Sequence, residues 1–568
     1  MDHMERYHQW LADPAIDEAT KEDLRKIAAD EKEIKERFYK DLEFGTGGLR
    51  GIIGAGSNRL NRYTVGRATQ GLANYILKEG TQDKGVAIAY DSRHMSPEFA
   101  QIAGLVLAGN GIRAYVYPSL RPTPMLSFAV RELGCTAGIV ITASHNPPEY
   151  NGYKVYWADG AQVVAPRDKD IIAEVNAVAS FGEIKEMAMD EAQAKGLFQY
   201  ISEDVDNAFD ANVLAQRQAP EIIEEMADDL KIVYTPIHGS GNLPVRRALE
   251  KAGFHQVYVV KEQEMPDSDF TTVGYPNPED PKVFVLAQKL AEEKGADIIV
   301  GTDPDCDRVG IAVKDKNGDY QLLTGNQTGM LLFDYICSQR TKHNRMPADP
   351  VMVKTIVSMD MAEQIAKNYG VKVINVLTGF KFIGEQIGFL EKQGKEDSYI
   401  FGFEESYGYL SGSYVRDKDA VNGAFLICEM FSYYATQGIS LLDKLNELFD
   451  KYGYCLNTLH SYEFDGSAGF EKMQQIMETF HEEVGEGKKI ESFAGKKINT
   501  VLDYSKGLDG LPKSDVLKYL LDGNCSVVVR PSGTEPKLKT YISVSAKSRE
   551  DAEVIEKKIA DELGGFFA

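Results

Sequence analysis

The sequence predicts a large α/β protein, in which three repeated α/β domains with mixed, mainly parallel sheets precede a smaller α+β domain. Three observations support this prediction. The chain has 568 residues, more than one hydrophobic core normally fills, so roughly three to five domains are expected. A strand–turn–helix–glycine–strand pattern occurs three times. From about Leu441 the pattern changes to strands followed by a charged helix.

The first forty residues favour helix. Charged residues dominate the segment 21–42, while Leu24, Ile27, Ile34 and Phe38 recur at helical spacing. We expect an amphipathic helix here that packs through its apolar side.

Each repeat joins two apolar strands through a helix, so each is predicted to be a βαβ unit with parallel strands. A glycine near the end of each helix suits a left-handed C-cap. The three copies occupy residues 86–118, 231–260 and 351–376, with glycines at Gly111, Gly253 and Gly370.

The C-terminal part is predicted to contain the strands CSVVVRPS and LKTYISVSA and the helix SREDAEVIEKKIADEL. A polar, acidic stretch near residues 180–230 separates the first two α/β units. The expected domains are 1–205 with the serine loop, 206–318 with the aspartate loop, 319–440 with a sugar-binding loop and 441–568 as the α+β domain.

Composition excludes several classes of protein. The net charge is −23 and there is no long basic run, so nucleic-acid binding is not expected. No apolar run reaches the length of roughly 18 residues that spans a bilayer, and the N-terminus lacks the apolar stretch of a signal peptide. Six cysteines are scattered without a CxxC motif, which favours a reducing compartment. We therefore expect a cytoplasmic protein.

The segment GTDPDCDR at 301–308 follows an apolar strand and places Asp303, Asp305 and Asp307 in alternation. Such a density of carboxylates is repulsive unless a cation is bound, and hard oxygen ligands suit Mg²⁺, Mn²⁺ or Ca²⁺. An EF-hand is excluded, since its glycine and glutamate positions hold Arg308 and Lys314. A metal site at the end of this strand is the preferred interpretation.

The segment TASHNP at 142–147 also follows an apolar strand. Ser144 in this loop is either a nucleophile or a turn former, and the segment lacks the GxSxG pattern of a hydrolase. Lys154 follows ten residues later, and spacing alone favours a surface lysine in a strand over a general base.

Two further loops carry polar groups. GFEESYG at 402–408 offers acceptors for sugar hydroxyls, and a charged turn without a binding role is an equally good interpretation of this segment. RPSGTEPK at 530–537 combines an arginine, hydroxyl side chains and a glycine at a turn, which suits phosphate. The sequence contains no GxxxxGK[ST] motif and no clean GxGxxG, so an NTPase or a dinucleotide enzyme is disfavoured.

Together, these four loops resemble those of the α-D-phosphohexomutase family in order and spacing, from FGTGGLRG at 44–51 to RPSGTEPK. The segments NGYKVYW and EES are most similar to the phosphoglucomutase and phosphopentomutase branch. The resemblance implies three α/β domains and a small α+β domain around a central cleft.

The resemblance also implies roles for particular residues. Ser144 would carry the transferable phosphate as phosphoserine, and Lys154 would be the general base. Arg308 and Arg50 would steady the phosphoserine, while His145 would support the loop. The implied Mg²⁺ ligands are a phosphoserine oxygen at Ser144 together with Asp303, Asp305 and Asp307.

For the substrate, the resemblance implies that Lys381 faces the sugar and that Glu404 and Ser406 bind its hydroxyls. The residues implied to hold the non-reacting phosphate are Arg530, Ser532, Gly533 and Thr534. Phosphomannomutase-like members carry a histidine just after the sugar-loop serine, where this chain has Tyr407 and Gly408. This difference disfavours a mannose substrate.

The implied activity is the interconversion of glucose 1-phosphate and glucose 6-phosphate, with glucose 1,6-bisphosphate as intermediate. Alternatives are a phosphopentomutase acting on ribose or deoxyribose 1-phosphate, a sugar-bisphosphate synthase, a phosphatase and, from a different class, a non-catalytic phosphosugar-binding protein. The expected partner is a small phosphosugar, without nucleic acid or membrane, and both a monomer and a homo-oligomer remain open.

Overall fold

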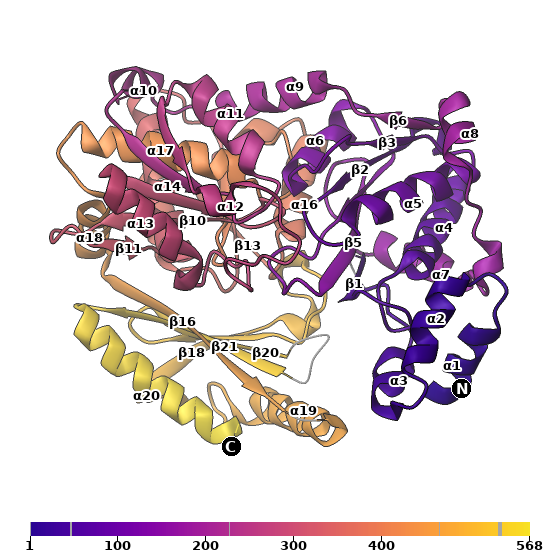
Figure 1. The fold of residues 1–568 in the computed structure, drawn as a ribbon. Coiled ribbons are helices and arrows are strands. Elements are labelled where there is room, and N and C mark those ends of the chain that lie inside the picture. Colours follow the sequence, from indigo (N-terminus) through magenta and orange to yellow (C-terminus); the bar gives the residue numbers. More distant parts are fainter. Residues whose placement is uncertain (1, 46–47, 227, 465, 532–536, 568) are drawn as a thin grey trace. The chain divides into compact units, whose positions relative to one another are not determined.

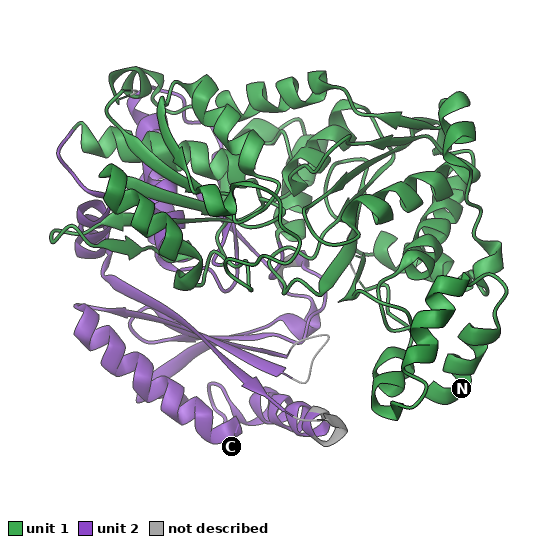
Figure 2. Ribbon diagram, viewed as in Figure 1, with its two compact units in different colours: residues 1–325, 380–402, 406–436 green, residues 326–379, 403–405, 437–568 purple. Residues whose placement is uncertain are grey.

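The computed structural model describes residues 2–567 except 46–47, 227, 465 and 532–536. The chain forms two compact units (Figure 2). Unit 1 comprises residues 1–325, 380–402 and 406–436, and unit 2 comprises residues 326–379, 403–405 and 437–568. No helix in the described part of the chain is long and apolar enough to cross a membrane.

The N-terminal segment of unit 1 forms three helices, α1 (His3–Ala12), α2 (Glu18–Lys26) and α3 (Glu31–Phe38). The expectation of one amphipathic helix over 21–42 is therefore wrong. The Asp30 side chain accepts a hydrogen bond from the backbone N–H of Glu33 and starts a new helix there. The apolar spacing persists across the break, so that Leu24, Ile34 and Phe38 share one core.

The first sheet of unit 1 has the order β1-β5-β4-β2-β3-β6. Its strands are β1 (Gly48–Ile52), β2 (Val86–Tyr90), β3 (Ala114–Val116), β4 (Ala137–Ile141), β5 (Tyr150–Trp157) and β6 (Phe198–Tyr200). Strand β2 pairs in parallel with β3 and β4, whereas β5 is antiparallel to β4. The helices of this region are α4 (Arg62–Glu79), α5 (Ser96–Gly109), α6 (Thr123–Glu132), α7 (Arg167–Ala177), α8 (Met189–Ala194) and α9 (Glu203–Leu214).

The second sheet of unit 1 has the order β11-β10-β9-β7-β8. Its strands are β7 (Lys231–Thr235), β8 (Gln256–Val259), β9 (Ile298–Thr302), β10 (Val309–Lys314) and β11 (Tyr320–Leu322). Strand β7 is parallel to β8 and β9, while β10 returns antiparallel to β9. The accompanying helices are α10 (Pro220–Met226), α11 (Asn242–Ala252), α12 (Lys261–Glu264) and α13 (Val285–Lys294).

The third sheet has the order β13-β12-β14-β15, and the chain passes between the two units within β14. Its strands are β12 (Val351–Thr355), β13 (Lys372–Val376), β14 (Tyr399–Glu404) and β15 (Gly408–Leu410). The pair β12 and β13 is parallel. The helices here are α14 (Gly325–Lys342), α15 (Met361–Tyr369), α16 (Phe380–Lys392), α17 (Ala420–Ala435) and α18 (Leu441–Tyr452).

All three predicted βαβ units are confirmed, because their strand pairs are parallel. The glycine after each helix has a positive φ: 73° at Gly111, 113° at Gly253 and 69° at Gly370. A side chain with a Cβ is strained in that conformation, so glycine ends these helices at low cost.

The C-terminal part of unit 2 is an antiparallel sheet of order β16-β21-β20-β19-β18-β17, along which helix α20 (Arg549–Phe567) lies (Figure 1). The predicted strands correspond to β20 (Cys525–Pro531) and β21 (Lys537–Ala546). The remaining elements are β16 (Tyr454–Glu463), α19 (Gly466–Glu483), β17 (Ser492–Phe493), β18 (Lys496–Asp503) and β19 (Leu517–Leu521). The predicted fold class, three α/β domains and an α+β domain, is confirmed.

Candidate active site

Ser144 lies in the loop that follows β4, at the carboxyl end of that strand. Its φ is 53°, a left-handed conformation that is costly for a residue with a side chain. Two hydrogen bonds hold this turn. The backbone N–H of Ser144 donates to Thr142 Oγ1 at 2.8 Å, and Thr142 Oγ1 donates to Asp91 Oδ2 at 2.7 Å. The Ser144 residue is 4% exposed.

The aspartate loop connects β9 to β10, in the other sheet of unit 1. Its three carboxylates are buried, and one ligand atom from each lies within 4.8 Å of the others. Asp303 Oδ1 accepts the backbone N–H groups of Asp307 and Arg308, which fixes the turn. Ser144 Oγ donates to Asp303 Oδ2 at 3.0 Å, so the two predicted loops meet.

The trio has the properties of a site for a divalent cation. Burial and the neighbouring carboxylates raise the pKa values of Asp303 and Asp307 above the usual range. Oδ1 of Asp305 and Oδ1 of Asp307 are buried without a hydrogen-bond partner. Burying unpaired carboxylate oxygens is costly, and a hard cation such as Mg²⁺ supplies the missing partner.

Lys154 reaches this site from β5, where Gly152 lets the strand run close to the serine loop. A Cβ on Gly152 would lie 2.5 Å from the carbonyl oxygen of Thr142. Two residues further on, Lys154 Nζ donates to Asp305 Oδ2 at 3.0 Å. Burial raises the pKa of Asp305, but the Lys154 and Lys418 ammonium groups and the hydrogen bonds with Asp303 and Lys154 together hold that pKa below its usual value.

A second lysine of the site was not predicted. Lys418, between β15 and α17, places Nζ 3.0 Å from Asp307 Oδ2. Thr123 was also missed: its hydroxyl donates to Asp305 Oδ2 at 2.9 Å and its backbone N–H to the Asp305 carbonyl. The available signal for Lys418 was the RDKDA segment, a dense group of charges just before an apolar helix.

The remaining predicted catalytic residues surround the serine loop. His145 Nδ1 lies 3.2 Å from Ser144 Oγ, and burial together with Arg308 and Arg50 holds the pKa of His145 well below its usual value. Arg50 Nη1 donates to Asn146 Oδ1 at 3.4 Å. Arg308 Nη1 donates to Glu279 at 3.0 Å. The structure thus brings the side chain of Arg50, from β1, to the loop that carries Ser144 and His145.

Two predicted substrate residues converge within unit 2. Glu404, at the end of β14, accepts the backbone N–H of Gly379 at 3.0 Å. Arg530, at the end of β20, donates to the hydroxyl of Thr378. Both therefore meet the loop between β13 and α16. Three further predicted phosphate-binding residues lie outside the described part of the chain, namely Ser532, Gly533 and Thr534.

Lys381 and Ser406 belong to unit 1. Lys381 lies in the first turn of α16, where burial lowers the pKa of its ammonium group. Ser406 lies in the turn between β14 and β15. Lys381 thus lies in a helix and Ser406 in a turn, and their predicted contacts with the sugar stay predictions.

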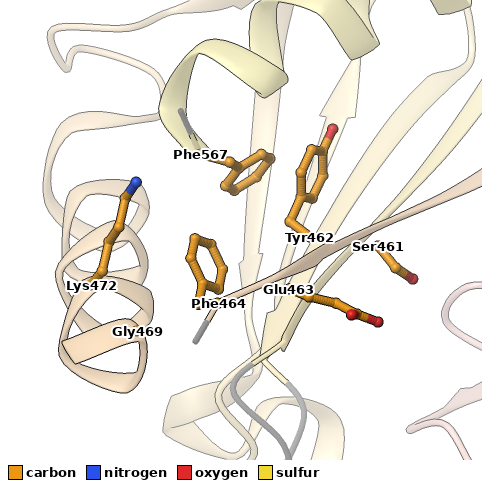
Figure 3. A pocket seen from close by; sticks show the side chains of 7 residues that line it. All are labelled: Ser461, Tyr462, Glu463, Phe464, Gly469, Lys472 and Phe567. Carbon is orange, nitrogen blue, oxygen red and sulfur yellow. The ribbon is translucent and has the colours of Figure 1, made fainter. Parts of the chain in front are cut away.

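Unit 2 also contains a cavity of about 600 Å³ at one end of the C-terminal sheet (Figure 3). Rings from β16 and from the end of α20 surround it, and the Lys472 side chain extends beside them. Its lining residues are Ser461, Tyr462, Glu463, Phe464, Gly469, Lys472 and Phe567. None of these is a predicted site residue, so this cavity is separate from the chemistry described above.

Comparison with known proteins identifies the fold and the family. Models of the phosphoglucomutase/phosphomannomutase α/β/α domains I, II and III match residues 41–181, 211–318 and 324–452, and the model of the C-terminal domain matches residues 483–562. Among solved structures, the Paramecium phosphoprotein parafusin, a phosphoglucomutase, superposes with a TM-score of 0.70 at 17% identity, covering 93% of this chain and 96% of that one. A Burkholderia thailandensis protein of the phosphoglucomutase/phosphomannomutase family gives a TM-score of 0.65 at 17% identity, with coverage of 92% and 97%.

Curated relatives are considerably more similar in sequence. A phosphoglucomutase of Staphylococcus epidermidis is 37% identical over 564 residues, covering 98% of this chain and 99% of its own length. A Staphylococcus aureus phosphoglucomutase is 37% identical over 530 residues, with coverage of 91% and 92%. The chain therefore belongs to the phosphoglucomutase/phosphomannomutase family and is an intramolecular phosphotransferase of the isomerase class.

Proposed function

We propose that this protein is an α-phosphoglucomutase, which interconverts glucose 1-phosphate and glucose 6-phosphate through phosphoserine 144 and glucose 1,6-bisphosphate. The observation that carries the proposal is the approach of Ser144 Oγ to within 3.0 Å of Asp303 in a buried carboxylate trio. Curated relatives at 37% identity over nearly the whole chain are named phosphoglucomutase. Unpaired thiols at all six cysteines support a cytoplasmic location.

In this proposal, phosphoserine 144 transfers its phosphoryl group to the free hydroxyl of the sugar phosphate. The bond between phosphorus and Ser144 Oγ breaks as the bond to the sugar oxygen forms. Lys154 accepts the hydroxyl proton in its neutral amine form, after its ammonium has lost a proton to solvent, and Ser144 leaves as an alkoxide that takes a proton from solvent. After the bisphosphate reorients, its other phosphate returns to Ser144 by the reverse steps.

Asp303, Asp305 and Asp307 would hold Mg²⁺ together with a phosphoserine oxygen. When bound, Mg²⁺ neutralises charge on the transferring phosphoryl group. Arg308 and Arg50 would steady that group, and neutral His145 would support the loop beside it. Glu404, Ser406 and Lys381 would bind the sugar. The residues proposed to hold the other phosphate are Arg530, Ser532, Gly533 and Thr534.

The test is a coupled assay for glucose 6-phosphate formed from glucose 1-phosphate, with Mg²⁺ and a trace of glucose 1,6-bisphosphate. We expect fast turnover that EDTA abolishes and that excess Mg²⁺ restores. Ribose 1-phosphate is measured in parallel, and a higher kcat/KM on the pentose would replace the glucose assignment by the phosphopentomutase alternative. Release of free phosphate without sugar isomerisation would instead identify a phosphatase.

The matched variants are Ser144→Ala and Ser119→Ala. Ser144→Ala should lower steady turnover by at least about 10⁴-fold, because the covalent route is removed, while the fold persists. Ser119→Ala alters an exposed serine outside the proposed site and should retain activity. Near-normal turnover by Ser144→Ala would disprove the phosphoserine scheme.

A further inference from the structure

The Arg93 guanidinium group lies against the serine loop, and its Nη atoms donate to backbone carbonyl groups of residues 144–150. Nη2 donates to the carbonyl oxygens of Ser144 and Asn146, and Nη1 to those of Pro147 and Tyr150, at 2.5 to 3.0 Å. A guanidinium group has four Nη hydrogens, so these four carbonyls match its terminal donors in number. One side chain therefore binds three carbonyls of the loop between β4 and β5 and a fourth at the start of β5.

The position of Arg93 is itself fixed by the fold. Arg93 lies in the turn just after β2, separated from the strand by Asp91 and Ser92, and is 1% exposed. Its Nε lies 3.4 Å from Asp91 Oδ2, and its own backbone N–H donates to Asp91 Oδ1. The ring of Phe270, from the second sheet's part of unit 1, lies 5.1 Å from the guanidinium carbon. A paired, stacked arginine of this kind is a rigid support for the loop.

The serine loop requires such a support. Ser144 has a φ of 53°, and a left-handed residue with a side chain persists only where its surroundings hold it. Without Arg93, the buried carbonyl group of Ser144 and the half-buried carbonyl groups of Asn146, Pro147 and Tyr150 would lose this donor, a costly arrangement that the loop would relieve by moving. The Ser144 hydroxyl would then leave its place 3.0 Å from Asp303.

We propose that Arg93 is a positioning residue of the phosphoryl-transfer site, which acts through the four carbonyls of residues 144–150 and does not touch substrate. The kinetic part of this inference rests on the proposed function, whereas its structural part, the support of the loop, does not. Because the terminal donors of Arg93 are directed at the loop carbonyls, its charge serves the loop and not the sugar phosphate. Arg93 thereby differs from Arg50 and Arg308, whose proposed role is to contact the phosphoserine.

The experiment compares Arg93→Met, Arg93→Lys and the wild type. The control is Arg59→Met, which removes another buried arginine whose guanidinium donates to the carbonyls of Glu36 and Asn58. Steady-state kinetics on glucose 1-phosphate give kcat and KM. Amide hydrogen exchange, followed on the peptide covering residues 142–150, reports the loop independently of any activity.

We expect kcat of Arg93→Met to fall by about 100-fold, since a displacement of about 1 Å at a reacting group has this effect. KM should stay within about threefold, because substrate binding is not the step affected. Arg93→Lys should recover part of kcat, since an ammonium group can reach only some of the four carbonyls. Exchange in residues 142–150 should become at least about tenfold faster in Arg93→Met and remain unchanged in Arg59→Met.

Several outcomes would overturn the proposal. The first is a kcat of Arg93→Met within about threefold of the wild type. The second is unchanged hydrogen exchange of residues 142–150 in Arg93→Met. The third is a loss of kcat in Arg59→Met equal to that in Arg93→Met. If the wild type itself lacks mutase turnover, the proposed function fails, while the exchange comparison still decides the role of Arg93. If Arg93→Met does not fold, Arg93→Lys against Arg59→Lys provides the same comparison.

Discussion

At the scale of single residues, burying the carboxylates of the aspartate loop costs free energy of folding. A bound cation removes this cost. Asp307 is buried, its Oδ1 has no hydrogen-bond partner, and its pKa is raised by burial and by Asp305. The variant Asp307→Asn removes this charge and one proposed ligand. In EDTA we expect its Tm to equal or exceed that of the wild type, because the carboxylate repulsion is relieved. With Mg²⁺, we expect it to lose most of the thermal shift that the wild type shows.

Thermal unfolding in EDTA and over a Mg²⁺ series measures this effect. At a concentration of about 100 times the Kd, a ligand stabilises the folded state by about 2.7 kcal/mol. The control is Asp319→Asn, which alters an exposed carboxylate in the turn before β11 and should keep the full shift. A wild-type-sized Mg²⁺ shift in Asp307→Asn would contradict the assignment of Asp307 as a ligand.

The sequence predicted the residues of the two loops but not all of their partners. Asp303, Asp305 and Asp307 were identifiable because alternating carboxylates after a strand have few other uses. Lys154 has no such local signal, and spacing alone favoured a surface position. Its Nζ reaches Asp305 because β5 runs antiparallel to β4, a pairing that brings Lys154 opposite Val140. Lys418 likewise reaches Asp307 from a distant part of the sequence and was missed.

At the scale of elements, Asp419 caps helix α17 from a fully buried position. Its Oδ1 accepts the backbone N–H groups of Val421 and Asn422, and its Oδ2 accepts the Tyr414 hydroxyl. Burial nevertheless raises its pKa from 3.8 to about 6. The folded state therefore holds a proton that the unfolded state has lost between about pH 4 and pH 6, so this group's contribution to stability falls as pH rises through that range.

This shift predicts the pH dependence of a variant. Between pH 5 and pH 7.5, the titration of Asp419 lowers the free energy of unfolding of the wild type by about 1.4 kcal/mol. Asp419→Asn does not titrate, so its Tm relative to the wild type should be higher at pH 7.5 than at pH 5. Asp419→Ala should show the same pH trend but lie lower at every pH, since it also loses the cap, worth about 1 kcal/mol. A Tm difference between Asp419→Asn and wild type that stays constant with pH would contradict the raised pKa.

Elements with strong local signals were predicted well. The three βαβ units combine apolar strands with a glycine that ends each helix, and all three have parallel strands in the structure. The N-terminal helices were predicted less well. The break between α2 and α3 depends on Asp30 acting as an N-cap, and an aspartate inside a charged stretch does not reveal that role by composition.

At the scale of the whole molecule, four motifs in order sufficed to identify the family, and the comparisons confirm it. The predicted domain boundaries at 205, 318 and 440 stay predictions. Sequence patterns describe neighbours along a chain, whereas a compact unit is defined by contacts across it. Unit 2 accordingly combines residues 326–379 with residues 437–568, a grouping that no local pattern indicates.

One ion pair of unit 2 illustrates such a long-range contact and gives the last prediction. Lys518 Nζ, from β19, donates to Asp360 Oδ1 at 2.8 Å, across 158 residues of sequence. Ser526 donates to the other oxygen of Asp360 at 2.7 Å, and Lys354 lies 3.4 Å from Oδ1. Burial raises the pKa of Asp360, but the two lysines outweigh it and hold that pKa well below the usual range. The carboxylate is therefore charged and depends on both lysines.

Lys518→Met removes one of these two partners from a largely buried site, and breaking a buried pair costs about 3 kcal/mol or more. We expect a lower Tm and faster limited proteolysis of the C-terminal sheet, because β19 loses its connection to the start of α15. The control is Lys497→Met, which breaks a pair with Glu486 whose side chains are 57% and 66% exposed. An exposed pair contributes at most about 1 kcal/mol, so this variant should resemble the wild type. Equal Tm and proteolysis rates for the two variants would show that the Asp360–Lys518 pair does not stabilise unit 2. The stability of unit 2 would then come from the apolar contacts beneath the sheet.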